Sequence, residues 1–517
     1  MPKVTRDAVV ALSLANLCFL SSWLVLLNHY HYAYYNWPAD PGFIEIEALI
    51  ICILLLGFLL WLAASILRKT QSNGALQIGR IALLFSLILP INSLFADYLK
   101  VSLFGFLTTR RWLLFAALPA AVGLVIIFYR YQRRLFNAAT TLLIILSPLV
   151  VVNATSAIWL RHKYASPESF RRGEPTPVTS RRNGPRVVWI IFDEFDQHTA
   201  FSNRPAGTKL PEFDRFRNES LSSSNAYPPN QFTLVSIPAL ITGQPLLTSL
   251  PVAPDECLLT LANGEQVNWS RQSSVFSQAR SEGLTTGVAG WYHPYCRVLG
   301  ASLDFCSWVP VIDQINPALD QLSLPHAMWI ATRTSAFRIP FVFRLFESQY
   351  ETQRMLDHQE EFVRVLREAK TLLTRDLDLT LLHFPVPHHP WIYDANQGTF
   401  SNLLGSDYED NLALADRTFG EVRAALEGAS QWDNAIVLVT SDHWWRTAET
   451  VNGKRDHRIP FMLKLPGQKV GLEYAKPFNT IVTRELLLQL LRGNLKSSAE
   501  VTAWLDQQPW VDVVATE

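Results

Sequence analysis

Charge of either sign is scarce in the first part of this sequence. Among residues 1–160 only 16 side chains are charged, 11 basic and 5 acidic, whereas residues 161–517 carry 74 charges, 34 basic and 40 acidic. The whole chain has a formal net charge of zero and no block of Lys or Arg, which argues against a nucleic-acid-binding protein, because such proteins neutralise phosphates. Low-complexity tracts and repeats of solenoid length are also missing, which argues against a disordered chain or a repeat array.

Long apolar runs occupy the stretch in which charge is scarce. Four of them approach the ~20 residues that cross a bilayer core. They are Val9–Leu27, Ala48–Leu67, Trp112–Tyr129 and Leu135–Leu160. A fifth run, Ile81–Phe95, is shorter and contains Pro90. The first run is longer than the apolar region of a cleaved signal peptide, and no clear cleavage site follows it. We therefore predict that residues 1–160 form a helical transmembrane domain of about five spans.

Basic side chains gather in three alternate segments around these runs, which is typical of cytoplasmic loops. They are Lys3 and Arg6, then Arg68, Lys69 and Arg80, and then Arg130, Arg133 and Arg134. The segment 28–43 has neither Lys nor Arg. We predict a multi-pass inner-membrane protein whose N-terminus is cytoplasmic and whose chain after about Leu160 is periplasmic or extracellular. Arg110 and Arg111 do not fit this scheme, so we interpret residues 100–111 as an interfacial segment.

The second part of the chain has the pattern of a soluble domain. Residues 161–185 are polar and rich in Pro and Arg, which predicts an exposed linker. After them, short runs rich in β-branched and aromatic residues alternate with helical stretches such as Gln359–Leu373 and Asn411–Leu426. The short runs are Val187–Phe192, Leu379–Phe384, Ile436–Thr440 and Phe461–Leu465. We expect residues 186–517 to form an α/β domain with a mainly parallel central sheet between helices.

Polar residues adjoin these predicted strands. They are Asp193 and Glu194, His388 and His389, Asp442 and His443, and, just before the last run, His457. Because chemistry gathers at the carboxyl ends of parallel strands, the set predicts a metal site with mixed oxygen and nitrogen ligands. Each residue alone has a plainer interpretation. A strand-terminal Asp often caps the next helix, and we interpret His383, inside its strand, as a core residue whose hydrogen bonds are satisfied.

These residues resemble motifs of the alkaline phosphatase and sulfatase superfamily, and specifically of its membrane-anchored branch, which includes phosphoethanolamine transferases and lipoteichoic acid synthases. In that superfamily a hydrophobic strand ends in an acidic metal ligand, an Asp-His pair follows a late strand, and a further His precedes Ile-Pro. The corresponding segments here are Phe192-Asp193-Glu194, Ser441-Asp442-His443 and His457-Arg458-Ile459-Pro460. The segment Pro387-His388-His389-Pro390 resembles the Pro-His-x-Pro segment of the family. The resemblance covers about residues 186–493.

The nucleophile separates the branches of this superfamily. Sulfatases have the motif Cys-x-Pro-Ser-Arg, followed a few residues later by Leu-Thr-Gly, and their Cys is oxidised to formylglycine. Here the stretch from Thr233 to Gly243 reads TLVSIPALITG and has neither that Cys nor that Arg. Thr233 stands where the sulfatase Cys would fall and resembles the nucleophile of phosphoethanolamine transferases. A threonine at this place is also an ordinary helix cap, and Ser236 is the reserve nucleophile and a candidate substrate contact.

The resemblance implies a divalent metal, zinc or manganese, and a set of ligands for it. The implied ligands are Asp193, Glu194, Thr233, Asp442 and His443, with His457 on the metal or on the bound phosphate. His388 is implied to contact the substrate, and His389 is the alternative. The chain departs from the family in having Asp-Glu after the strand rather than one acidic residue. This departure leaves the division of roles between Asp193 and Glu194 open.

The resemblance also implies a reaction. A threonine hydroxyl is a poor nucleophile until a metal lowers its pKa. Thr233 would attack a membrane phospholipid, with His388 as the acid for the departing diacylglycerol. A hydroxyl of an envelope glycan or glycolipid would then take phosphoethanolamine or phosphoglycerol from the phosphothreonine. The alternatives are a membrane-anchored phosphodiesterase or sulfatase-type hydrolase, which passes the group to water, and an inactive scaffold, which would need a broken site.

The cysteines give an independent prediction about the outer part of the chain. Cys18 and Cys52 lie in apolar runs, where they act as small apolar residues. The other three face an oxidising compartment if the predicted orientation is right. Cys296 and Cys306 flank a short loop that a disulfide can close, which would leave Cys257 free, although three cysteines allow three different pairs.

Overall fold

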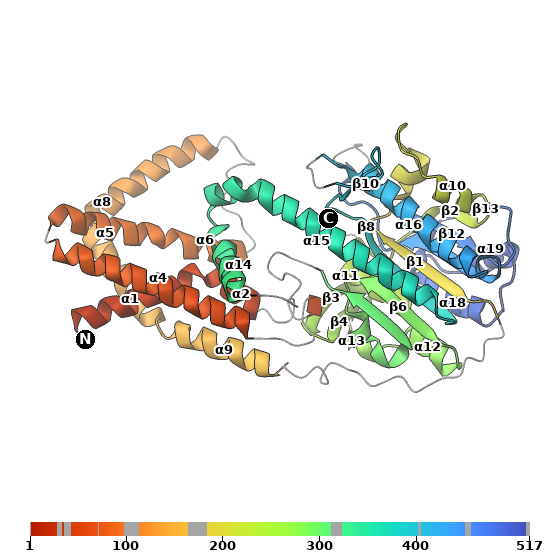
Figure 1. Cartoon of the computed structure of the whole chain (residues 1–517), viewed down its shortest axis with the longest axis horizontal. Coiled ribbons are helices and arrows are strands. Elements are labelled where there is room, and N and C mark those ends of the chain that lie inside the picture. Colours follow the sequence, from red (N-terminus) through yellow and green to blue (C-terminus); the bar gives the residue numbers. More distant parts are fainter. Residues whose placement is uncertain are drawn as a thin grey trace. The chain divides into compact units, whose positions relative to one another are not determined.

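The computed structural model shows a helical part and a part built on a sheet (Figure 1). The described residues are 2–27, 34–35, 43–70, 72–97, 113–163, 184–311, 323–401, 405–449 and 456–512. The helical unit comprises Met1–Tyr32, Pro38–Pro167 and Asp313–Tyr350, and the sheet unit comprises Ala33–Trp37, Glu168–Ile312 and Glu351–Glu517. Two pieces of chain are grouped with the unit that lies farther from them in the sequence. Residues 33–37 belong to the sheet unit, and residues 313–350 belong to the helical unit. Most of the predicted linker, residues 164–183, lies outside the described residues.

Apolar helices make up the N-terminal part of the helical unit. They are α1 (Lys3–Cys18), α2 (Leu20–Leu27), α4 (Ile44–Lys69), α5 (Asn73–Ser86), α6 (Ile88–Asp97), α8 (Leu113–Leu146) and α9 (Leu149–Lys163). Three described stretches are long and apolar enough to cross a membrane, namely Ile44–Lys69, Asn73–Asp97 and Tyr129–Lys163. The bent pair α1 and α2, with an angle of 61° between its helices, makes a fourth if it counts as one span. The predicted N-terminal set of apolar helices is confirmed.

One predicted turn is replaced by continuous helix. The sequence pattern put a loop at Arg130–Arg134, between two apolar runs, but these residues lie inside helix α8. No Gly or Pro interrupts the chain between Gly123 and Pro148, and Arg, Gln and Leu are good helix formers. The break comes instead at Pro148, which has no backbone N–H to donate. The predicted interfacial segment 100–111 lies outside the described residues.

A helix from far along the chain completes the helical unit. Helix α14 (Leu324–Ala336) packs against α4 and α2. The Ser22 hydroxyl on α2 donates to the backbone oxygen of Ala331, at 2.8 Å. Just after α14, Arg338 forms an ion pair with Asp97 at the end of α6. Sequence analysis did not predict this helix as part of the apolar bundle, because its 13 residues are too few to cross a bilayer.

The sheet unit is built on a central sheet of nine strands. Its order is β13 (Leu472–Tyr474), β2 (Leu221–Tyr227), β12 (Ile459–Lys464), β11 (Ile436–Ser441), β1 (Val187–Asp193), β8 (Leu379–Pro387), β6 (Thr286–Trp291) and β7 (Phe305–Val309), with β14 (Phe478–Asn479) paired to β2. Only β12 pairs antiparallel with its neighbours, so the predicted mainly parallel sheet is confirmed. Strands β1, β8 and β11 are buried along their whole length, which explains their continuous apolar sequences.

Helices cover both faces of this sheet, and alternate residues of β1 enter two separate cores. Val187, Trp189 and Ile191 belong to one core, while Val188, Ile190 and Phe192 belong to the other. The first core includes residues of α11 (Thr233–Thr242), α12 (Val275–Ser281), α13 (Tyr295–Val298), α18 (Thr483–Leu491) and α19 (Ser498–Leu505). The second includes residues of α10 (Pro211–Arg217), α15 (Pro340–Leu373) and α16 (Tyr408–Gly428). A three-stranded sheet of β3 (Leu246–Ala253), β4 (Glu256–Leu261) and β5 (Gln266–Asn268) and the pair β9 (Tyr393–Asp394) and β10 (Thr399–Phe400) lie outside the central sheet.

The predicted disulfide is present at one end of the central sheet. Cys296 of α13 is bonded to Cys306 of β7, and Cys257 is free and buried. The bridge ties the last strand of the sheet to the helix before it. Disulfides persist in oxidising compartments and are rare in the cytosol, so the bridge agrees with the predicted placement of this unit outside the cytoplasm.

Candidate active site

The candidate site lies where parallel strands of the central sheet end side by side. Strand β1 ends at Asp193, and its parallel neighbour β11 ends one residue before Asp442. The register pairs Phe192 with Ser441, which brings Asp193 and Asp442 to the same edge. Strand β8, on the other side of β1, ends just before His388, whose backbone N–H donates to the backbone oxygen of Asp193 at 3.1 Å. Three predicted motifs thus meet at one sheet edge.

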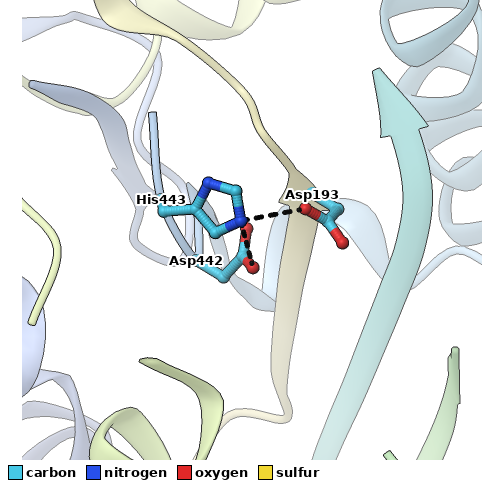
Figure 2. Close-up of side chains that lie close together, drawn as sticks. All are labelled: Asp193, Asp442 and His443. Atoms are coloured by element: carbon cyan, nitrogen blue, oxygen red, sulfur yellow. Dashed lines mark ion pairs between the residues drawn. The ribbon is translucent and has the colours of Figure 1, made fainter. Parts of the chain in front are cut away.

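Asp193, Asp442 and His443 form a compact, fully buried group. Figure 2 shows one ring nitrogen of His443 facing the carboxylates of both Asp193 and Asp442. The Nε2 atom of His443 lies 3.4 Å from Oδ1 of Asp193 and 3.5 Å from Oδ2 of Asp442. One ligand atom from each residue lies within 4.8 Å of the other two, a spacing that a metal ion can bridge, and no other group of His, Cys, Asp and Glu among the described residues meets it.

The donor set fits a divalent metal. Two buried carboxylates side by side are costly without a cation, and burial, followed by the neighbouring carboxylates of Asp442 and Glu194, raises the pKa of Asp193. The Oδ2 atom of Asp442 has no hydrogen-bond partner among the described residues, although it is buried. Carboxylate oxygen and imidazole nitrogen are ligands that both zinc and manganese accept. The unpartnered oxygen is what an anionic ligand without its metal leaves behind.

Thr233 supplies a hydroxyl at this group. It is the first residue of α11, a helix that ends at Gly243 in the left-handed conformation with φ of 68°. Its Oγ1 lies 3.1 Å from Nε2 of His443 and 3.4 Å from Oδ2 of Asp193. Thr233 is buried, with an exposed fraction of 6%. The hydroxyl is therefore held beside the candidate metal ligands and not in open solvent.

Glu194 faces a different partner from the adjacent Asp193. Its backbone has φ of 63°, in the left-handed region that costs a non-glycine residue about 1 kcal/mol. The Glu194 carboxylate accepts from Nε of Arg446 at 2.9 Å, and its backbone oxygen accepts from the Tyr408 hydroxyl at 2.6 Å. Burial opposes ionisation of Glu194, but His388, His443 and Arg446 outweigh it and hold the pKa of Glu194 below its usual value. The turn after β1 thus directs Glu194 toward Arg446 and Asp193 toward Asp442 and His443.

Residues 185–484 match the sequence model of a family described as Sulfatase. The chain belongs to the sulfatase family. Solved structures with a similar fold include a sulfatase from Pseudoalteromonas (15% identity, 60% of this chain and 68% of that chain, TM-score 0.42). They also include a phosphonate monoester hydrolase from Agrobacterium radiobacter (12% identity, 63% and 79%, TM-score 0.40). An alkaline phosphatase superfamily protein from Vibrio parahaemolyticus (15%, 61% and 68%, TM-score 0.37) is similar too. No sequence among the curated proteins matches this one.

Other predicted residues of this sulfatase-family site have different neighbours. Ser236, the reserve nucleophile, is fully buried, and its hydroxyl donates to the backbone oxygen of Asp442 at 2.6 Å. The ring of His457 stacks on Trp444, with 4.1 Å between the ring centres. His389 packs edge-on against Trp391, with 5.0 Å between the ring centres. Ser236 therefore contacts the backbone of the loop that carries Asp442 and His443. His457 and His389 each pack against a tryptophan.

His383 differs from the interpretation of a fully satisfied core residue. Its Nδ1 atom lies 2.8 Å from the Tyr295 hydroxyl, but its Nε2 atom is buried without a hydrogen-bond partner among the described residues. Burial, the largest effect, lowers the pKa of His383 to about 4, so the ring is neutral at physiological pH. Of the two ring nitrogens of His383, only Nδ1 has a hydrogen-bond partner among the described residues.

Arg446 is a site residue that sequence analysis missed. Besides its ion pair with Glu194, its NH2 group lies 3.3 Å from Nε2 of His388. Arg446 therefore links Glu194, in the motif that follows β1, to His388, in the motif that follows β8. The only signal in the sequence is its place three residues after His443, which pointed to no particular chemistry until the loop geometry was known.

Proposed function

We propose that this sulfatase-family chain is a metal-dependent transferase. It moves phosphoethanolamine or phosphoglycerol from a membrane phospholipid to a hydroxyl of an envelope glycan or glycolipid. The observation that carries the proposal is the Thr233 hydroxyl, 3.1 Å from His443 Nε2 and 3.4 Å from Asp193 Oδ2. A hydroxyl at this place attacks phosphorus and leaves a phosphate ester, whereas the sulfatase pattern has a Cys that becomes formylglycine.

Asp193, Asp442, His443 and Thr233 are the proposed ligands of a zinc or manganese ion. When bound, the metal lowers the pKa of the Thr233 hydroxyl and neutralises charge on the phosphoryl oxygens. In the first step Thr233 gives up its hydroxyl proton to solvent, the bond from Oγ1 to phosphorus forms, and the bond from phosphorus to the diacylglycerol oxygen breaks. His388, in its protonated form, donates a proton to the departing oxygen. In the second step the bond from an acceptor oxygen to phosphorus forms as the acceptor's proton passes to His388, the bond from phosphorus to Oγ1 breaks, and a proton from solvent restores Thr233.

Glu194 and Arg446 have a supporting role in this proposal. Arg446 contacts both Glu194 and His388, and its positive charge is proposed to bind a non-bridging phosphoryl oxygen. Glu194, predicted as a metal ligand, instead holds the guanidinium in place. His457, which stacks on Trp444 next to His443, is proposed to contact the bound phosphate, and His389 to line the acceptor side.

The apolar helices support a lipid donor. A protein whose N-terminal helices enter a bilayer meets phospholipids by diffusion in two dimensions, and a soluble phosphatase has no need of such helices. The disulfide between Cys296 and Cys306 supports a site on the oxidising side of the membrane, where envelope glycans and glycolipids are found.

A donor-labelling experiment tests the proposal. Purified full-length protein is mixed with phosphatidylethanolamine or phosphatidylglycerol, each labelled in its head group, and with a lipid extract of the cell envelope. We expect the label to move to one glycolipid, with diacylglycerol released in equal amount. Mass spectrometry of the product identifies the group that moved. Release of the labelled head group into water at the full rate of donor cleavage, with no labelled acceptor, would favour the hydrolase alternative.

The orientation of the chain gives a separate prediction. A reporter enzyme that works only in the periplasm, fused after Arg171, should be active, because the positive-inside pattern places that residue outside. The same reporter fused after Lys69 should be inactive. Activity of a cytoplasm-specific reporter at Arg171 would contradict the predicted orientation and would place the site away from its proposed acceptors.

A further inference from the structure

Two tyrosines from the segment between α2 and α4 lie inside the core of the sheet unit. Tyr34 is completely buried, and Tyr35 is 5% exposed. Tyr34 packs edge-on against Tyr35 and His293, with ring centres 5.1 and 5.9 Å apart. Both tyrosines belong to the same hydrophobic core as the strand and helix residues of the first sheet face. A piece of chain that connects two apolar helices is therefore part of the folded unit that carries Thr233.

A chain of two hydrogen bonds leads from Tyr34 to the proposed nucleophile. The Tyr34 hydroxyl lies 2.8 Å from Nδ1 of His293. On the other side of the ring, Nε2 of His293 lies 3.1 Å from the backbone oxygen of Thr233. His293 is fully buried just after β6, and its ring also packs edge-on against Trp269, with 5.0 Å between the ring centres. Nothing in the proposed reaction uses these two bonds directly.

The partners of His293 determine which ring nitrogen carries the hydrogen. A carbonyl oxygen only accepts hydrogen bonds, so Nε2 must donate to Thr233. In a neutral imidazole the other nitrogen is then an acceptor, so the Tyr34 hydroxyl must donate to Nδ1. The Thr233 carbonyl selects this tautomer, and the Tyr34 hydroxyl holds the ring in place by donating to Nδ1. Without that hydroxyl, Nδ1 is buried without its donor, and a turn of the ring that finds another partner for Nδ1 takes Nε2 away from the carbonyl.

We propose that Tyr34 is a positioning residue for the nucleophile. It holds the ring of His293 in place, the ring holds the first peptide group of α11, and that peptide group sets the direction of the Thr233 side chain. This inference rests on the proposed role of Thr233. It makes the competence of the active site depend on Tyr34, which lies between α2 and α4, and not only on residues 186–517.

The test measures turnover of bis(p-nitrophenyl) phosphate by full-length protein in detergent. This probe needs no acid for its leaving group, so its rate reports the attack by Thr233. We expect Tyr34→Phe to lower kcat at least tenfold with KM changed less than twofold, because an aligned nucleophile affects the transition state more than binding. Tyr35→Phe is the matched control: it removes the same group from the adjacent residue, whose hydroxyl donates to Tyr292 at 3.2 Å. It should keep kcat within twofold.

Variants of His293 separate positioning from simple packing. Leucine can neither accept from Tyr34 nor donate to the Thr233 carbonyl, so His293→Leu should lower kcat at least tenfold. In the His293→Leu background, Tyr34→Phe should lower kcat less than twofold further. The loss in His293→Leu alone is measurable even if Tyr34→Phe does not fold.

The outcomes distinguish this inference from the proposed function. Wild-type kcat in either Tyr34→Phe or His293→Leu would overturn the inference, and so would an equal loss in Tyr35→Phe. An undiminished effect of Tyr34→Phe in the His293→Leu background would assign Tyr34 to packing and also overturn the inference. If wild-type protein cleaves the probe but Thr233→Ala does so equally well, the proposed nucleophile is wrong, whatever the Tyr34 variants do.

Discussion

Thr233→Ala should lower turnover by at least about a thousandfold, because loss of the nucleophile removes the covalent route altogether. The hydroxyl lies 3.1 Å from His443 Nε2, and the remaining residues of the site can bind substrate but cannot form the ester. The fold should persist, since one net hydrogen bond is worth about 1 kcal/mol. Incubation of wild-type protein with labelled phospholipid and no acceptor should place the label on Thr233, and intact-mass measurement detects it.

Thr242→Ala is the matched control for this prediction. Thr242 is the last residue of the same helix and is equally buried, but its hydroxyl donates to the backbone oxygen of Pro238, at 2.7 Å, away from the site. Its variant should keep normal turnover. Ser236→Ala tests the reserve nucleophile, since Ser236 bonds the backbone of Asp442. Full activity in Thr233→Ala, or a label that moves to Ser236, would contradict the assignment of the nucleophile.

Asp442→Asn should weaken metal binding by more than about a hundredfold, because loss of a residue that merely orients a metal ligand already costs ten- to a hundredfold. Its buried Oδ2 has no hydrogen-bond partner among the described residues, and Asn removes the negative charge that this oxygen offers a cation. Activity should return in part at high metal concentration, whereas Thr233→Ala should stay inactive at any concentration. Metal content after dialysis, measured by mass spectrometry, checks the affinity directly.

Asp416→Asn provides the comparison. Asp416 is another buried carboxylate, and it accepts hydrogen bonds from the backbone N–H groups of Phe213 and Glu212. The asparagine at that position can still accept one of these bonds, so a loss of stability is expected without a loss of metal. Equal metal content in Asp442→Asn and wild type would contradict the proposed ligand set. Removal of metal from the wild type by a chelator, and its replacement by zinc or manganese, identifies the ion.

The edge of the sheet at which the candidate site lies could be predicted from the sequence. Asp193 and Asp442 each follow a continuous apolar run, and parallel strands deliver the residues after such runs to one edge. The order of the strands and their register, which pair Phe192 with Ser441, could not be predicted, because residues about 250 positions apart carry no local pattern that relates them. The resemblance to known motifs supplied that relation instead.

The different partners of Asp193 and Glu194 were beyond sequence analysis. The sequence does not show which way each of two adjacent carboxylates points, because their directions depend on the backbone angles. Here Glu194 has a left-handed φ, and its carboxylate accepts from Arg446. Arg446 was missed for the same reason, since its role depends on a loop. Helix α8 shows the opposite case: a charge pattern suggested a turn at Arg130–Arg134, but local helix propensity continued through it.

Residues 33–37 are grouped with the sheet unit and residues 313–350 with the helical unit, and this grouping has a consequence for biosynthesis. Tyr34 leaves the ribosome long before its partner His293, and at about 5–20 residues per second the interval is roughly ten to fifty seconds. Throughout that time Tyr34 lacks this hydrogen-bond partner. Helix α14, in turn, reaches the helices it packs against only after most of the sheet unit has been made. A chain interrupted before His293 therefore lacks both the hydrogen bond between Tyr34 and His293 and the packing of α14 on α4.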